Sequence, residues 1–263
     1  FAYVRLGKSV VFAKDTPTVI ANRIGTFSVL NIMRLMQEMG LSIEEVDALT
    51  GRAVGWPKSA TFRTIDLVGL DVLGHVVANM EKGSGYEAHL NLLPDFVKQM
   101  LSRKWLGDKT KGGFYKKVKG EDGREDERLA LDWRTLEYHP RQKPKLPALD
   151  MAKNLEEIGP RVRMLLGLDG GVSQKGDKAG AFLGSALSDL WNYSAIRVPE
   201  ISDSIVEIDR AMRMGFNWEL GPFELWDAVG LEATVARMKK EGKAIAANVE
   251  KLLASGKKSW YAD

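Results

Sequence analysis

The sequence of 263 residues contains no cysteine. This absence excludes disulfides, thiolate sites for zinc or iron–sulfur clusters, and a cysteine nucleophile, and it is compatible with a reducing compartment. No uninterrupted apolar run approaches the roughly 20 residues that a membrane helix needs. With 44% hydrophobic residues, the chain can bury one large or two ordinary globular cores. We therefore expect a soluble, cytoplasmic protein without a membrane span.

A strong charge of one sign is also lacking, because 38 Lys and Arg residues stand against 35 Asp and Glu residues. The net charge of +3 predicts no nucleic-acid partner and at most a local attraction for an anionic ligand. No dinucleotide-binding glycine motif is found. The glycines at 167–184 follow GxxxG-like spacings and no predicted strand precedes them. We predict no metal site.

The first 40 residues predict a short strand followed by a long helix. Residues 10–13 form an apolar run typical of a short buried strand. Residues 15–17 (DTP) offer a capping hydroxyl followed by proline, which predicts a helix that runs to about Met39 and ends before Gly40. Apolar positions recur every three or four residues on the face that carries Asn22. We therefore expect Asn22 to be at least partly buried.

Further elements are predicted along the rest of the chain. Ser42 and Glu45 form a capping box that begins a second helix. Between the strand-like runs 114–118 and 129–138, a charged segment predicts a solvated hairpin that turns at Asp122-Gly123. A stiff linker then contains Pro140, Pro144 and Pro147. The remaining helical patterns lie at 62–80, 95–106, 179–194, 202–214 and 225–253.

The most informative feature is an internal repeat. Residues 42–47 match residues 204–209 at an offset of 162, and Trp56 matches Trp218 at the same offset. After a slip of one residue, the pattern Phe-x-x-x-Asp-x-Val-Gly-Leu at 62–70 matches residues 223–231. Residues 109–115 and 258–261 end the two copies in a similar way. We expect packing and capping roles for the repeated side chains, which are Trp56, Trp218, Phe62, Phe223, Asp66 and Asp227.

Three ordered motifs resemble the carboxy-terminal part of 3-hydroxyacyl-CoA dehydrogenases, the NAD-dependent enzymes of β-oxidation. The motifs are residues 14–23 (KDTPTVIANR), the segment 55–71 that contains GWP and DLVGLD, and residues 107–115 (GDKTKGGFY). In the second copy, residues 221–227 (GPFELWD) resemble a string of the same family. The tandem arrangement is similar to the long bacterial members. Residues 58–62 (KSATF) depart from the Gly-Pro-Phe of many members.

The resemblance implies an all-α fold, a tandem repeat of a helical domain like the C-terminal domain of 6-phosphogluconate dehydrogenase, with a short β-hairpin linker. It divides the chain into a remnant of a Rossmann domain at 1–13, a first helical domain at 14–115, a linker at 116–148 and a second helical domain at 149–263. We call 14–115 the first copy and 149–263 the second copy. The copies are expected to pair as an intramolecular pseudo-dimer, or the chain as a homodimer.

By the same resemblance, two residues take functional roles. Asn22 matches the catalytic asparagine, whose neutral amide orients the reacting oxygen; a buried structural asparagine is the alternative. Lys109 matches a lysine that approaches bound NAD, and a solvated loop lysine is the alternative. Gly184 or Ser185 lies opposite Asn22 at an offset of about 162, so only the first copy is expected to serve catalysis.

The resemblance implies NAD-dependent oxidation of an L-3-hydroxyacyl-CoA to the 3-oxoacyl-CoA, in which the chain supplies a wall of the acyl-CoA cleft and the pairing surface. The family's Rossmann domain and His–Glu pair are not found, since none of His75, His89 and His139 precedes Asn22. We therefore expect the chain alone to be inactive. The alternatives are a non-catalytic helical interaction module derived from the family, and a dehydrogenase of hydroxy or sugar acids. The tail at 107–115 argues against the last.

Overall fold

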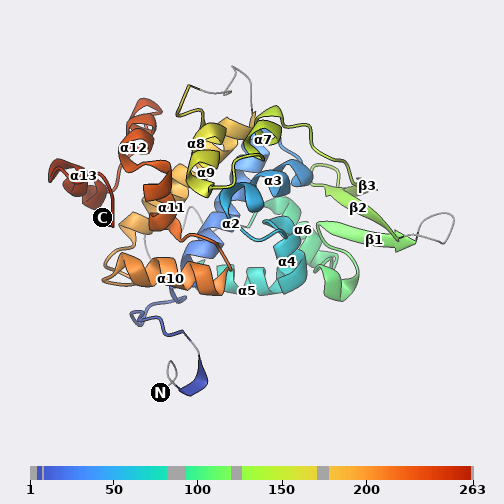
Figure 1. Ribbon diagram of the computed structural model, residues 1–263. Coiled ribbons are helices and arrows are strands. Elements are labelled where there is room, and N and C mark those ends of the chain that lie inside the picture. Colours follow the sequence, from blue (N-terminus) through green and yellow to red (C-terminus); the bar gives the residue numbers. More distant parts are fainter. Residues whose placement is uncertain (1–4, 8, 82–92, 120–125, 171–177, 262–263) are drawn as a thin grey trace.

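In a computed structural model of the chain, helices pack around one long central helix and a small sheet lies at one edge (Figure 1). The structure describes residues 5–7, 9–81, 93–119, 126–170 and 178–261. The predicted mainly helical fold is confirmed. The first copy contains α2 (Ile20–Met39), α3 (Ile43–Leu49), η1 (Arg52–Val54), α4 (Phe62–Val68), α5 (Leu70–Glu81), α6 (Asp95–Ser102) and η2 (Asp108–Thr110).

In the described residues of the second copy, the regular elements are all helices. The helices predicted over 179–194 and 202–214 are found, whereas the run 225–253 is divided into three helices. The elements are α7 (Pro147–Ala152), α8 (Ile158–Leu166), α9 (Lys178–Ile196), α10 (Ile205–Gly215), α11 (Pro222–Val229), α12 (Leu231–Lys240) and α13 (Ala247–Ala254).

The central helix α2 begins later than predicted. Thr18 has a φ of 59°, a left-handed conformation that a right-handed helix cannot contain. The proposed cap at Thr16 is therefore not used, and α2 begins at Ile20. Its end is as predicted, because Gly40 adopts the left-handed conformation with a φ of 65° and its N–H donates to Gln37.

The helix predicted over 62–80 is interrupted at Gly69. This residue has a φ of 108°, which favours glycine and ends α4. The N–H of Leu70 donates to the carbonyl of Leu106 instead of continuing the helix. The same break recurs in the second copy, where Gly230 has a φ of 105° between α11 and α12. The repeated Val-Gly-Leu pattern thus marks a bend between two helices.

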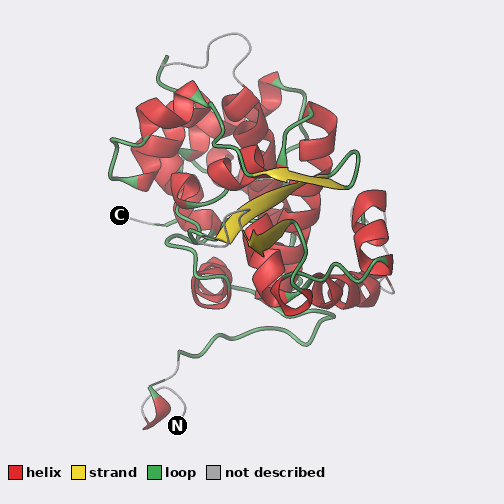
Figure 2. Cartoon of the chain, turned by 90° about the vertical axis from the view of Figure 1, so that its right-hand side faces the viewer, coloured by secondary structure: helices red, strands yellow, loops and turns green. Residues whose placement is uncertain are grey.

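A three-stranded antiparallel sheet contains the predicted hairpin and extends it by one strand (Figure 2). β1 (Tyr115–Lys119) pairs with β2 (Asp126–Asp132), which pairs with β3 (Glu137–Pro140). The run predicted at 129–138 is divided by a turn in which Leu136 has a φ of 58°. The turn predicted at Asp122-Gly123 lies outside the described residues.

The prediction of a strand at 10–13 is wrong. These residues form an irregular segment that leaves the body of the molecule (Figure 1), and Phe12 is 73% exposed. In the described part of the chain they have no neighbouring strand to supply ladder hydrogen bonds. The segment contacts the second copy instead, since the N–H of Phe12 donates to Glu207 at 2.8 Å and that of Lys14 to Ile201 at 3.0 Å.

The two copies pack against each other within the chain. α2 lies along α9, and Phe27 stacks on Tyr193 with 3.8 Å between ring centroids. Trp56 stacks on Trp218 at 4.4 Å, so each copy contributes one of the repeated tryptophans to the contact. The buried apolar side chains of both copies form one continuous core.

Candidate functional site

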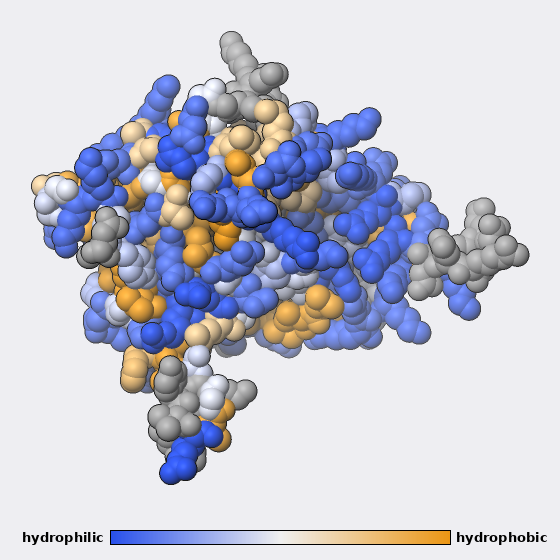
Figure 3. Space-filling view, in the orientation of Figure 1, coloured by the Kyte–Doolittle hydropathy of each residue, from blue (hydrophilic) through white to orange (hydrophobic). Residues whose placement is uncertain are grey.

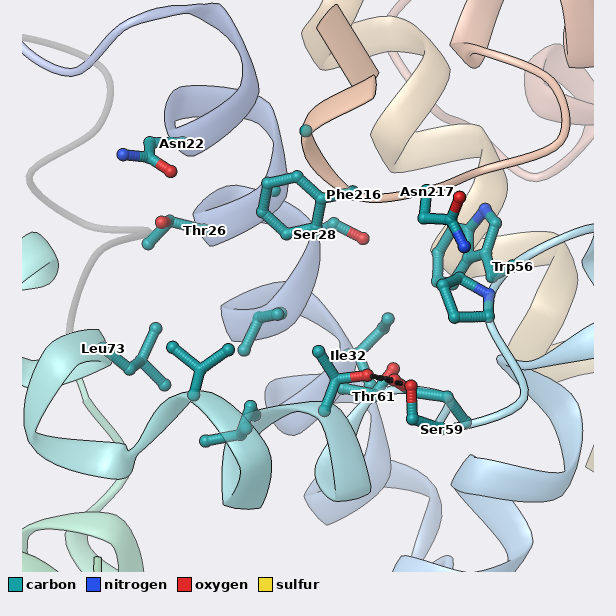
Figure 4. A pocket seen from close by; sticks show the side chains of 18 of the residues that line it. Asn22, Thr26, Ser28, Ile32, Trp56, Ser59, Thr61, Leu73, Phe216 and Asn217 are labelled. Atoms are coloured by element: carbon teal, nitrogen blue, oxygen red, sulfur yellow. Dashed lines mark hydrogen bonds between the residues drawn. The ribbon is translucent and has the colours of Figure 1, made fainter. Parts of the chain in front are cut away.

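An open cavity of about 500 Å³ lies between α2, α4 and α5 of the first copy. The loop at 56–61 forms a further wall, and residues 215–218 of the second copy complete it (Figure 4). Its apolar lining with a few polar groups is typical of a site for a small molecule. The polar residues in the lining are Asn22, Thr26, Ser28, Ser59, Thr61, Thr64 and Asn217.

Asn22 lies in the first turn of α2 and lines the cavity. Figure 4 shows it on one side of the cavity, with Trp56 and Asn217 on the other. The expected partial burial of Asn22 is wrong, because the residue is exposed. Asn22 lies at the N-terminal end of α2, before Thr26 and Met33, which are buried positions of the same helix face. Its amide is therefore open to a ligand rather than held in the core.

Phe216 follows α10 and is a residue of the second copy that lines the cavity. Its ring lies so close to α2 that a Cβ on Gly25 would be 2.0 Å from the Cζ of Phe216. Gly215 packs on Ala21, one helical turn earlier. Phe216 was not predicted from the sequence as a site residue. The available signal was Gly25 in a helix interior, where glycine costs about 0.5–1 kcal/mol relative to alanine.

Lys109 lies beside the cavity but is not part of its lining. It forms an ion pair with Asp71, and the two side chains are 43% and 35% exposed. Lys109 lowers the pKa of Asp71. Its Nζ lies next to Gly69, which does line the cavity. The η2 turn therefore places a cation near the wall formed by α4 and α5.

The repeated residues Asp66 and Asp227 face the protein interior and organise the chain. Asp66 accepts hydrogen bonds of 2.8 Å from the N–H groups of residues 114–115. Asp227 accepts equivalent bonds of 2.8–2.9 Å from the N–H groups of residues 260–261. The predicted structural role is found for both residues, but each carboxylate holds a distant segment of the chain rather than the cap of a helix.

A second matched pair, Asp47 and Asp209, fixes the following helix in each copy. Asp47 accepts from the N–H groups of residues 62–63 and from the Tyr115 hydroxyl. Asp209 accepts from residues 223–224 and from the Tyr261 hydroxyl in the same way. Burial raises the pKa of each carboxyl to about 7. The repeat in the sequence pairs Asp47 with Asp209 but indicates no role for either residue.

Indole rings occupy the space in the second copy that corresponds to the cavity. Ile65 lines the cavity in the first copy, and the residue at the offset of 161 is Trp226. Trp226 is fully buried and stacks on Trp191 of α9, with 5.6 Å between ring centroids. At the offset of 162, Trp191 corresponds to Val29, which also lines the cavity. The aliphatic side chains of Val29 and Ile65 in the first copy thus correspond to larger tryptophan side chains in the second copy.

An arginine occupies a further part of that space. Val76 lines the cavity, and its counterpart at the offset of 161 is Arg237. The Arg237 guanidinium donates to the carbonyls of Leu166 and Gly180 at 2.8 and 3.2 Å. It lies against Gly184, the residue opposite Asn22, so closely that a Cβ there would be 2.2 Å from its Nη2. In its described residues, the second copy therefore has neither a counterpart of the Asn22 amide nor space at the position that corresponds to the cavity.

An apolar patch on the surface continues the cavity lining. Figure 3 shows it over α4 and α5 at the lower edge of the molecule. The exposed side chains there are Leu67, Val68 and Val72, of which Val68 and Val72 also line the cavity. Apolar surface that is contiguous with a cavity is typical of a binding region.

The family model described as 3-hydroxyacyl-CoA dehydrogenase, C-terminal domain, matches residues 19–117 and 183–258. A Bacillus subtilis (strain 168) protein named as a probable 3-hydroxyacyl-CoA dehydrogenase is 42% identical over 97% of this chain and 31% of its own length. A Rickettsia prowazekii (strain Madrid E) protein named for a fatty acid oxidation complex trifunctional enzyme is 27% identical over 84% of this chain and 28% of its own length. The chain thus spans about a third of the length of these relatives.

Among solved structures, the chain is similar to a 3-hydroxybutyryl-CoA dehydrogenase from Escherichia coli K12. The TM-score is 0.62 at 18% sequence identity, over 95% of this chain and 63% of that chain. At this identity the similarity concerns the fold alone. In the part of the chain that the structure describes, no helix has the length and apolar character needed to cross a membrane.

Proposed function

The chain belongs to the 3-hydroxyacyl-CoA dehydrogenase family, and on this premise we propose that it is the substrate-binding part of an NAD-dependent L-3-hydroxyacyl-CoA dehydrogenase of fatty acid oxidation. The observation that carries the proposal is the apolar cavity with the open amide of Asn22 in its lining. The acyl chain would enter the cavity. Its apolar walls would exclude water and hold C3 of the substrate near the start of α2.

Asn22 is the proposed catalytic residue of this chain. Its side-chain N–H would donate to the 3-oxygen, which gains negative charge as the hydroxyl loses its proton. An amide suits this role because it donates without titrating. When bound, NAD supplies the hydride acceptor. Asn22 would therefore orient the oxygen while the hydrogen on C3 leaves.

We propose that the general base and most of the cofactor site lie outside these 263 residues. No histidine is among the described residues that line the cavity, and His89 lies outside the described residues. His139 lies on β3 and is not part of the cavity lining. Its Nδ1 is 3.9 Å from Oε1 of Glu44. Lys109 would approach the NAD pyrophosphate from η2, where a cation suits a polyphosphate. The chain alone is accordingly expected to be inactive.

Asn22→Ala tests the proposal in the enzyme that joins this chain to its NAD-binding part. Loss of one donor to a developing oxyanion lowers kcat by about 100-fold or more. Oxidation of 3-hydroxybutyryl-CoA, followed by NADH absorbance, measures the effect. Thr26→Val is the control, because it changes a polar group one turn along the same cavity wall. A kcat equal to wild type would remove Asn22 from the mechanism.

A titration of the isolated chain tests the division of labour. Acetoacetyl-CoA is expected to bind, as measured by calorimetry, whereas added NADH is expected to remain reduced. Appreciable oxidation of NADH would contradict the proposal that the base and cofactor site lie elsewhere. Absence of any acyl-CoA binding would instead favour the non-catalytic interaction module.

A further inference from the structure

We propose that the second copy completes the acyl cavity of the first, and that Phe216 limits the length of the acyl chain that the cavity accepts. This inference rests on the proposed function. It assigns the second copy a role in specificity, whereas its own cleft is occupied by side chains.

The two copies differ in the residues that decide whether the helices enclose space. The first copy has Val29, Ile65 and Val76 around the cavity. The second copy has Trp191, Trp226 and Arg237 at the corresponding offsets, and the two tryptophans are fully buried against each other. Among the described residues, the first copy therefore encloses an acyl-sized cavity, whereas side chains fill the corresponding space in the second copy.

Phe216 reaches the cavity because small residues let α10 approach α2. The carbon that alanine would add at Gly25 would overlap the tip of the Phe216 ring, and the one that alanine would add at Gly215 would lie 2.9 Å from Ala21. Asn217 has a φ of 53°, which turns the chain directly after the ring. In Figure 4 the ring lies between Asn22 on one side and Trp56 on the other. A chain that extends from Asn22 toward Trp56 would pass Phe216.

The ring therefore occupies volume that a longer acyl chain could use. Each methylene that gains apolar surroundings improves binding by about fourfold. A smaller residue at 216 should increase affinity for long chains more than for short ones, and a larger residue should do the opposite. Phe27 offers a matched control. Its ring also contacts the other copy, by stacking on Tyr193, but it does not line the cavity.

The experiment measures dissociation constants of the 263-residue chain for butyryl-CoA and decanoyl-CoA by calorimetry. Variants are Phe216→Ala, Phe216→Leu, Phe216→Trp and the control Phe27→Leu, each checked for folding by thermal unfolding. We expect the preference for decanoyl-CoA over butyryl-CoA to rise at least tenfold in Phe216→Ala and by a smaller factor in Phe216→Leu. It should fall in Phe216→Trp and stay within twofold of wild type in Phe27→Leu.

The outcomes separate the two proposals. If wild type binds neither thioester, the proposed function fails and the role of Phe216 fails with it. If wild type binds both and the folded variants at 216 keep its preference, only the role of Phe216 is overturned. If Phe216→Ala does not fold, the opposite shifts expected for Phe216→Leu and Phe216→Trp decide the question. An equal change in Phe27→Leu would show that the effect comes from the contact between copies rather than from the cavity.

Discussion

Among single residues, the buried carboxyl of Asp209 should make the free energy of unfolding depend on pH. Burial raises its pKa to about 7, above the ordinary value of 3.8. A carboxyl whose pKa is raised by folding stabilises the protein fully below its unfolded pKa, and this contribution is lost as the pH rises through the folded pKa. The contribution of Asp209 should therefore decrease between about pH 4 and pH 7.

Asp209→Asn tests this direction, because an amide does not titrate. The free energy of unfolding of wild type minus that of Asp209→Asn, from urea titrations at several pH values, should be largest near the acidic end. A difference that grows toward neutral pH would show that the two N–H donors and the Tyr261 hydroxyl lower the carboxyl pKa more than burial raises it.

Lys109 carries a prediction that separates cofactor binding from structure. Its partly exposed pair with Asp71 should contribute little to the stability of the fold, because solvent screens exposed ion pairs. Lys109→Met in the enzyme joined to its NAD-binding part should raise the KM for NAD several-fold and leave Tm nearly unchanged. Asp71→Asn is the control, because it frees the lysine without removing its charge. An unchanged KM for NAD would leave Lys109 with its structural pair alone.

At the scale of elements, the contact between α2 and the end of α10 predicts an unusual response to alanine. Alanine normally stabilises a helix interior by about 0.5–1 kcal/mol relative to glycine. At Gly25 the added Cβ would overlap the Phe216 ring, so Gly25→Ala should instead lower the free energy of unfolding by about 1–3 kcal/mol.

Denaturant titration measures this effect, with Gly74→Ala as the control. A Cβ at Gly74 in α5 would make an ordinary contact of 3.4 Å with Leu101, so this variant should be neutral or stabilised. Combining Gly25→Ala with Phe216→Ala should restore part of the lost stability. A stabilised Gly25→Ala single variant would show that the ring moves away freely.

Helices could be predicted where the sequence contains both an apolar periodicity and a residue that caps the helix. Examples are the capping box of Ser42 and the end of α2 at Gly40. Boundaries failed where one backbone angle decided them, as at Thr18 and Gly69, because local composition leaves such angles open. The site shows the same division. Asn22 follows from a motif next to a helix start, whereas the position of Phe216 depends on how two distant helices pack.

At the scale of the whole molecule, the two copies have the same supporting hydrogen bonds and differ in the side chains of their clefts. The paired aspartates make matching hydrogen bonds in both copies, while the cavity side chains of one copy correspond to tryptophans and an arginine in the other. The stacked tryptophans Trp56 and Trp218 and the shared core join the copies. A shared core predicts that the copies unfold together.

Asp66→Asn and Asp227→Asn form a matched pair that tests this coupling. Each replaces one of the two carboxylate oxygens that accept from backbone N–H groups by an NH2 group, which cannot accept. The change should cost about 1–3 kcal/mol and lower Tm by about 2–4 °C per kcal/mol. Because the copies share a core, each variant should shift one single unfolding transition, followed by calorimetry. If either variant instead splits the transition and moves only one part, the copies fold independently and the second copy supports the cavity only by contact.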